Sequence, residues 1–179
     1  MVEIKDDAET LSDEEAYAVV LLYGEDILES KGMIKQKEFV QHGDCSVFEH
    51  SVGVAKECVK RAYKSKESVD MRSLVRGALL HDYFLYDWHI PDKSRPMHGR
   101  YHPRAACKNA EEDFKLTDIE RDIIKKHMFP LTLTPPKYRE SVLVCLVDKV
   151  CSVYEIFNKN AYGGGTVNKV FERIRGTYK

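Results

Sequence analysis

The sequence has almost no net charge and no long apolar run, and each shortage excludes a class of protein. Its 28 Lys and Arg residues nearly balance 29 Asp and Glu residues, which leaves a formal net charge of -1. No global field therefore recruits nucleic acid or an anionic membrane. The apolar run from Val142 to Val147 ends at Asp148, far short of the roughly 20 residues that span a bilayer. We expect neither a membrane nor a nucleic-acid polymer as a partner.

Cysteine and export signals are also scarce. The five cysteines are an odd number without a CxxC pair, so the sequence suggests neither a disulfide framework nor a cysteine zinc site. The acidic start MVEIKDDAETLSDEE lacks the basic and apolar regions of a secretory signal. We therefore expect a cytoplasmic protein with reduced thiols.

What is present is the composition of one folded domain. Apolar residues make up 43% of the 179 residues and charged residues 32%, as in folded soluble proteins. We expect residues 1–40 to form a helical extension packed on a main domain of residues 41–160. Residues 161–179 are expected to form a glycine loop and a C-terminal helix. The N-terminal helix could serve as a homodimer face.

Apolar periodicity predicts an all-α chain. Capping boxes begin at Ser12 and Thr117. The apolar middle of residues 137–158 could be a buried strand, but the length of this stretch favours a central buried helix. Between Tyr83 and Tyr101 periodicity is lost, which predicts a functional loop. The predicted helices cover residues 12–29, 46–64, 69–80, 103–115, 117–127, 137–158 and 167–175.

Imidazoles and carboxylates lie on or at the ends of five predicted helices. Such ligands suit Fe, Mn, Zn, Co or Ni, and a helical bundle can bring them to one point. A carboxylate that follows an apolar run, as Asp148 does, is unfavourable when buried unless it is paired or bound to a cation. Asp82 can offer one oxygen to the metal that His81 binds and the other to a second metal. The candidate ligands are His50, His81, Asp82, His102, His127 and Asp148.

The order H…HD…D resembles the HD superfamily of metal-dependent phosphohydrolases. The resemblance is carried by FEHSVGVA around His50, GALLHDYFLYDW around His81 and Asp82, and CLVDKV around Asp148. It covers roughly residues 40–158. It implies a single-domain, HD-type helical bundle in which these four residues bind one divalent metal.

Two further segments resemble the binuclear branch of that superfamily. HPRAACKNAEE and IIKKHMFP imply that His102 and His127 bind a second metal, with Asp82 as the bridge. The chain departs from the cyclic-di-GMP phosphodiesterase branch, because it lacks the HDIGK and HHExxDGxGYP signatures. That function is therefore disfavoured.

The resemblance implies hydrolysis of a phosphomonoester or phosphoanhydride, with a nucleotide-like small molecule as substrate. A metal-activated water would attack phosphorus in line. We expect Asp82 to act catalytically at the metals, and Asp87 or His98 to relay protons. Basic residues of the loop could clamp the substrate phosphate, because Arg suits bidentate contact. These residues are Lys93, Arg95, Arg100 and Arg104.

Other interpretations remain open. Any one of these histidines taken alone is more often a hydrogen-bonded structural residue than a ligand, and the basic loop residues could be a solvated surface. The same ligand set occurs in di-iron oxygenases of the superfamily. A non-catalytic, nucleotide-binding regulatory module is the third alternative.

Overall fold

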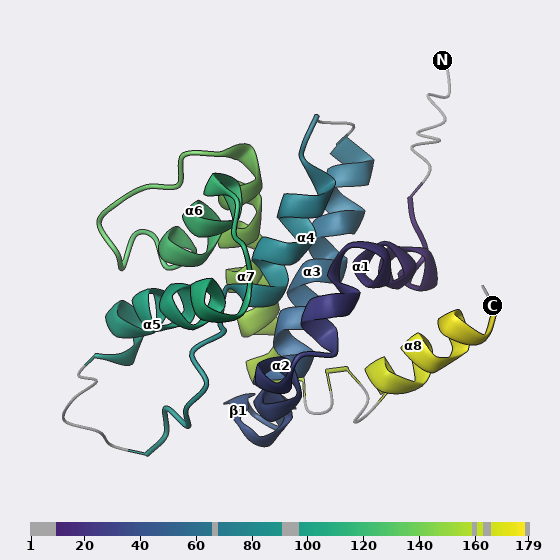
Figure 1. Cartoon of the computed structure of the whole chain (residues 1–179), viewed down its shortest axis with the longest axis horizontal. Helices are drawn as coiled ribbons and strands as arrows, with labels where there is room; N and C mark the ends of the chain where they lie inside the picture. The colour runs from purple at the N-terminus through teal and green to yellow at the C-terminus, as the bar shows by residue number, and fades with distance from the viewer. Residues whose placement is uncertain (1–9, 66–67, 91–96, 159–160, 163–165, 178–179) are drawn as a thin grey trace, which may run out of the picture.

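The computed structural model describes residues 10–65, 68–90, 97–158, 161–162 and 166–177. Within these ranges the chain forms α-helices, a short 3-10 helix and a two-stranded antiparallel hairpin (Figure 1), which confirms the predicted all-α, single-domain class. The elements are α1 (Asp13–Leu28), α2 (Lys31–Lys35), η1 (Gln36–Glu38), β1 (Val40–His42), β2 (Cys45–Ser46), α3 (Val47–Ser65), α4 (Met71–Leu80), α5 (His98–Asp113), α6 (Asp118–Lys126), α7 (Arg139–Phe157) and α8 (Thr166–Thr177).

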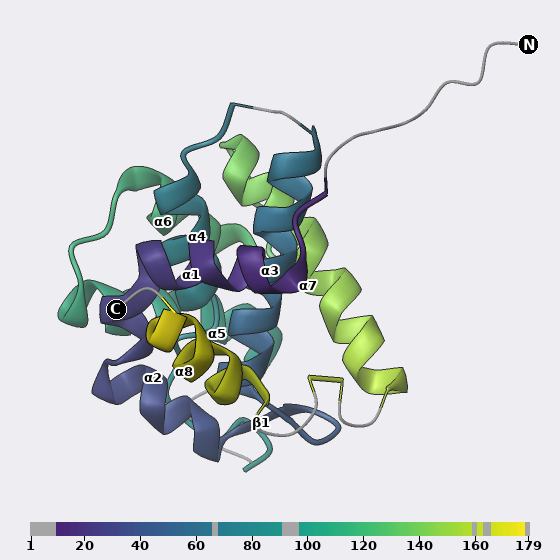
Figure 2. The same ribbon diagram turned by 90° about the vertical axis from the view of Figure 1, so that its right-hand side faces the viewer.

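Helices α3 and α4 lie side by side at the centre of the molecule (Figures 1 and 2). On α3 the residues Val52, Ala55 and Val59 recur at helical spacing and are fully buried, as are Val75 and Leu79 on α4. Helix α1 packs across this pair, whereas α6 and α7 cover its other side. Helix α5 packs on α6, and α8 packs on α1.

The predicted helix starts follow local chemistry. Ser12 caps α1 and Thr117 caps α6, and each forms a complete capping box with the glutamate three residues later. Asp70 caps α4 by accepting a hydrogen bond from the backbone of Ser73. These caps satisfy backbone donors that have no partner inside the helix.

The short elements between α1 and α3 were not predicted. Helix α2, the 3-10 turn and the hairpin of β1 and β2 are too short to leave an apolar period in the sequence. Gly43 makes the hairpin turn with a φ of +59°, a conformation that glycine adopts without strain. The hairpin matters for the site, since it carries Gln41 and His42.

Helix α5 begins five residues earlier than expected. The start was placed at Pro103, but the helix begins at His98 and Pro103 lies inside it. The expectation used proline as a marker of a first helical turn. In the structure the residues before Pro103 already follow the helical path, so His102 lies within the helix rather than at its entrance.

Helix α7 is confirmed as a helix, but the prediction that it is central and buried all round is wrong. It packs against α3 and α6 from one side and forms an edge of the molecule (Figure 2). Val142, Leu146, Val150 and Val153 are exposed on its outer face. An apolar run shows that a helix has surfaces suited to burial. How much of that surface is buried depends on how many neighbouring elements pack against the helix. Among the described residues, no helix combines the length and apolar character needed to cross a membrane.

Candidate metal centre

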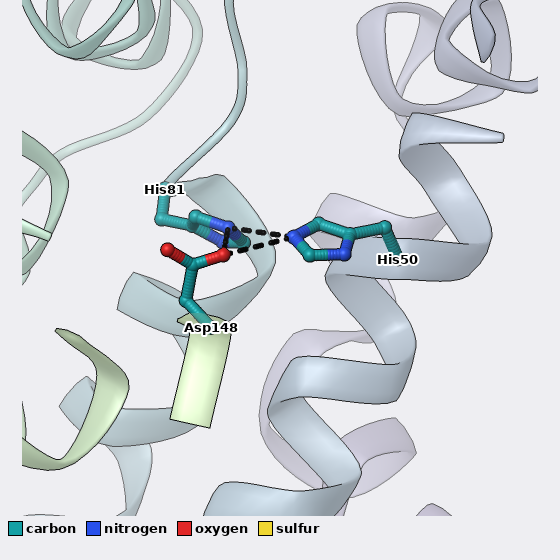
Figure 3. A group of neighbouring side chains, drawn as sticks. All are labelled: His50, His81 and Asp148. Carbon is teal, nitrogen blue, oxygen red and sulfur yellow. Dashed lines mark hydrogen bonds and ion pairs between the residues drawn. The ribbon is translucent and has the colours of Figure 1, made fainter. Parts of the chain in front are cut away.

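Three of the candidate ligands form a first triad: His50, His81 and Asp148 (Figure 3). His50 lies in the first turn of α3, His81 caps the end of α4, and Asp148 lies in the middle of α7. The Nε2 atom of His50 lies 3.3 Å from Nε2 of His81 and 3.2 Å from Oδ1 of Asp148. Bonds of about 2.1 Å to one ion place its ligand atoms roughly 3 to 3.5 Å apart. Both distances from His50 have this spacing, and the third, between Nε2 of His81 and Oδ1 of Asp148, is slightly longer at 3.7 Å.

The other three form a second triad: Asp82, His102 and His127. Asp82 follows His81 at the end of α4, His102 comes from α5, and His127 caps the end of α6. The Nε2 atoms of His102 and His127 are 2.8 Å apart, and they lie 3.1 Å and 3.4 Å from Oδ1 of Asp82. All six residues of the two triads are buried.

Asp82 joins the two triads. Its Oδ1 atom faces the imidazoles of the second triad. Its Oδ2 atom lies 3.5 Å from Nε2 of His81 and 3.8 Å from Nε2 of His50, on the side of the first triad. One carboxylate therefore presents one oxygen to each group of ligands, as a residue that bridges two ions would.

The four imidazoles are oriented by hydrogen bonds at their other ring nitrogen. The Nδ1 atoms of His81, His102 and His127 each lie 2.7–3.0 Å from a backbone carbonyl three or four residues earlier. Nδ1 of His50 lies 2.9 Å from both carboxylate oxygens of Glu155. Because the partners are acceptors, each Nδ1 carries the proton and each Nε2 of a neutral ring presents a lone pair.

The converging atoms are therefore mostly acceptors. Two lone pairs on Nε2 of His102 and His127 face each other at 2.8 Å, and Oδ1 of Asp82 is buried without a hydrogen-bond donor among the described residues. Acceptors packed this closely repel unless a proton or a cation lies between them. The donor set fits a metal ion, so these buried His and Asp residues could hold one or two.

Charges within the site shift its pKa values in a consistent way. Burial opposes a charge on His50, but Asp148 and Glu155 outweigh it and raise the pKa of His50 well above its ordinary value. The pKa of His81 is raised too, because Asp82 and Asp148 outweigh burial. Burial also opposes a charge on Asp82 and Asp148, yet the neighbouring imidazoles lower both of their pKa values.

His127 behaves differently. Burial lowers its pKa, the nearby His102 and His81 lower it further, and the adjacent Asp82 carboxylate does not compensate. Without a metal, His50 and His81 of the first triad therefore retain protons more strongly than His127 of the second. This difference follows from the number of carboxylates around each group.

Residues outside the triads hold them in place, and the sequence analysis did not identify them. Glu155 is 2% exposed, contacts His50 and accepts a hydrogen bond of 2.8 Å from Tyr162. It follows Asp148 by seven residues, or two helical turns, so a second carboxylate on the same face of the helix was the available signal. Gln41 donates to Oδ2 of Asp82 at 2.6 Å, and Gln36 donates to the Asp82 carbonyl at 2.6 Å. For the glutamines no sequence signal exists.

The two proposed proton-relay residues lie outside the triads. His98 stacks on His102 with ring centroids 4.5 Å apart, and its Nδ1 lies 3.1 Å from the hydroxyl of Tyr86. Burial and the neighbouring His102 lower the pKa of His98 to about 4. Asp87 instead accepts a hydrogen bond from the backbone of His89. His98 is thus beside the centre, whereas the described contacts of Asp87 are with His89.

Two of the four proposed phosphate-clamp residues, Arg100 and Arg104, are also outside the triads. Arg100 and Arg104 are exposed on α5, two positions before and after His102. With about 100° of rotation per residue, they lie on the side of α5 opposite His102. Lys93 and Arg95 fall outside the described residues.

Comparison with known proteins does not assign this chain to a family. A scan against protein-family models found no match, and searches of curated proteins and of solved structures also found none. The site therefore rests on its own geometry: an all-helical chain in which two His/Asp clusters, compatible with an HD-like arrangement, could bind metal.

Proposed function

We propose that this chain is an HD-superfamily phosphohydrolase that holds two divalent ions and cleaves a phosphomonoester or phosphoanhydride of a nucleotide-like molecule. The observation that supports this most directly is the position of Asp82, whose two oxygens face different triads. A carboxylate shared between two His-rich sites can hold two ions at the short separation that two-metal hydrolysis uses.

In this proposal each triad holds one ion. His50, His81 and Asp148 would bind the first, His102 and His127 the second, and Asp82 both. When bound, the ions would lower the pKa of a water molecule and stabilise the negative charge that develops on the phosphoryl group.

The other residues orient these ligands. Glu155 fixes the ring of His50 through Nδ1 and so presents Nε2 to the centre. Gln41 restrains the Asp82 carboxylate through Oδ2. His98 stacks on His102 beside the second triad, and its Nδ1 lies 3.1 Å from the hydroxyl of Tyr86, whereas Asp87 contacts His89. We therefore favour His98 over Asp87 as the relay.

The test combines metal analysis and hydrolysis on the same samples. Protein loaded with Mn, Fe, Co, Ni or Zn is analysed for bound metal and assayed against a panel of nucleotides and phosphomonoesters. We expect about two ions per chain and phosphate release that stops when a chelator removes them. Glu112→Gln, on the exposed face of α5, serves as a control that keeps both properties.

Two outcomes would contradict the proposal in different ways. Bound iron with oxygen consumption, but without phosphate release, would favour the di-iron oxygenase. No bound metal under any loading condition would favour a non-catalytic module.

A further inference from the structure

A basic groove of about 730 Å³ lies between α5 and the segment that follows α6. Its cationic side comes from two helices, and exposed leucines after α6 form another wall. Leu133 is 86% exposed. The groove is defined here by Arg100, Arg104, Lys125, Lys126, Leu131 and Leu133.

Positive charge gathers here although the whole chain is nearly neutral. Residues 93–110 and 123–139 contain no Asp or Glu, whereas the chain as a whole has a net charge of -1. The packing of α5 on α6 brings the described parts of these two acid-free stretches together. Like charges placed this close repel each other, and a bound anion would relieve the repulsion.

Among the described residues, three of the four cations of the groove lack the ion pairs that other cations on the same helices form. Lys108 pairs with Glu112 on α5, and Arg121 pairs with Glu111 and Asp118. Lys126 pairs with Asp122. Within the described ranges, no carboxylate lies within ion-pair distance of the remaining three, Arg100, Arg104 and Lys125.

The groove is separate from the metal centre. His102 points into the buried site, while Arg100 and Arg104 are exposed on the opposite side of α5. Neither arginine can therefore hold a phosphoryl group bound at the triads, as the proposed function would place it. A ligand in the groove would therefore bind independently of the metal centre.

We propose that this groove binds an organic oligophosphate, with its phosphates between Arg100, Arg104 and Lys125 and its organic part against Leu131 and Leu133. The volume is that of a small-molecule site, which lies at roughly 300–1,000 Å³. The arginines are one turn apart, so their Cβ atoms are about 5–6 Å from each other. Two guanidinium groups at that spacing suit linked phosphates, each of which can accept bidentate hydrogen bonds.

The test measures binding to the whole 179-residue chain after treatment with a chelator, so that no metal at the triads contributes. Inorganic triphosphate and adenosine triphosphate are titrated by calorimetry. We expect both to bind, the nucleotide more tightly because of the leucine wall, and both more weakly as ionic strength rises. The double variant Arg100→Gln/Arg104→Gln should weaken binding by about tenfold or more, because charged hydrogen bonds are lost.

A matched control separates the groove from overall charge. Lys108→Gln/Arg121→Gln removes the same number of positive charges, at ion-paired positions on α5 and α6 that do not line the groove, and should leave binding unchanged. Leu133→Asn should weaken adenosine triphosphate binding and spare inorganic triphosphate.

Equal losses in both double variants, or wild-type affinity in Arg100→Gln/Arg104→Gln, would overturn the inference. Neither result bears on hydrolysis at the triads, which is assayed separately with metal present. An inactive protein that binds triphosphate in the groove would keep this inference and remove the proposed function.

Discussion

The two triads use the same residue types, but their surroundings differ. The first is built on α3, α4 and α7, and two further carboxylates, Asp82 and Glu155, lie beside its own Asp148. The second is built largely on α5 and α6, and Asp82 is the carboxylate among its ligands. Negative charge is therefore concentrated on the first triad.

The larger number of carboxylates around the first triad affects how each triad would bind a cation. Carboxylates raise the pKa values of His50 and His81, whereas the pKa of His127 is lowered. A metal must displace protons from His50 and His81 at the first triad, whereas the lowered pKa of His127 favours a neutral imidazole at the second. Once the protons have left, the greater negative charge of the first triad should give it the higher affinity. An ion at the second triad should exchange more readily.

The largest effect is expected where the two triads share a residue. Asp82→Ala removes a ligand from both, so metal content should fall from about two ions to less than one, and hydrolysis by on the order of a thousandfold or more. Metal analysis and phosphate release on the same sample check this. Asp118→Asn, at the exposed start of α6, is the control. Two retained ions in Asp82→Ala would disprove the bridge.

A difference between the triads should appear when each loses one histidine. His127→Ala should keep one tightly bound ion, because the first triad remains whole, whereas His50→Ala should keep only an ion that dialysis removes. Metal content after dialysis distinguishes the two variants. Equal retention would mean that the extra carboxylates around the first triad do not set affinity.

A smaller effect is expected at Glu155. Glu155→Ala should lower affinity for the first ion by roughly 10- to 100-fold, because outer hydrogen bonds orient the ligand and raise its basicity. Glu155→Gln should recover part of the lost metal affinity, since the amide oxygen of Gln can still accept a hydrogen bond from Nδ1 of His50. Competition with a chromogenic chelator measures both values, with Glu172→Gln on the exposed face of α8 as control. A purely structural role would lower stability equally in both variants without changing their relative metal affinities.

The smallest effect is the pH dependence of the metal-free protein. The pKa of His50 is raised in the folded state, so its stabilising contribution is complete below the unfolded value of about 6.5 and is lost as pH rises through the folded pKa. Asp148 has a lowered pKa, so its contribution is present above about 3.9 and is lost as pH falls through its folded pKa.

Urea unfolding of chelator-treated protein between pH 5.5 and pH 9 checks this. The free energy of unfolding should decrease toward pH 9, and His50→Gln should flatten that decrease. Bound metal should reverse the trend, because protons compete with the ion for the same imidazoles. A metal-free stability that rises toward pH 9 would contradict the raised pKa of His50.

Much of the fold was predictable, since helices are encoded locally. The apolar periods of α3 and α4 and the capping boxes at Ser12 and Thr117 depend on neighbouring residues alone. The hairpin that carries Gln41 left no such signal, and neither did the start of α5 before Pro103. Both depend on contacts between segments far apart in the sequence.

The chemistry of the centre follows from the order of residues along the chain: which imidazoles and carboxylates are present, and that His81 and Asp82 stand at a helix end. How these groups face one another depends on the packing of the helices. That packing turns the two oxygens of Asp82 toward different triads and brings Glu155 to His50. It also leaves one side of α7 exposed. Helix rotation and packing are settled by all the surfaces that meet, so no single segment of the sequence encodes them.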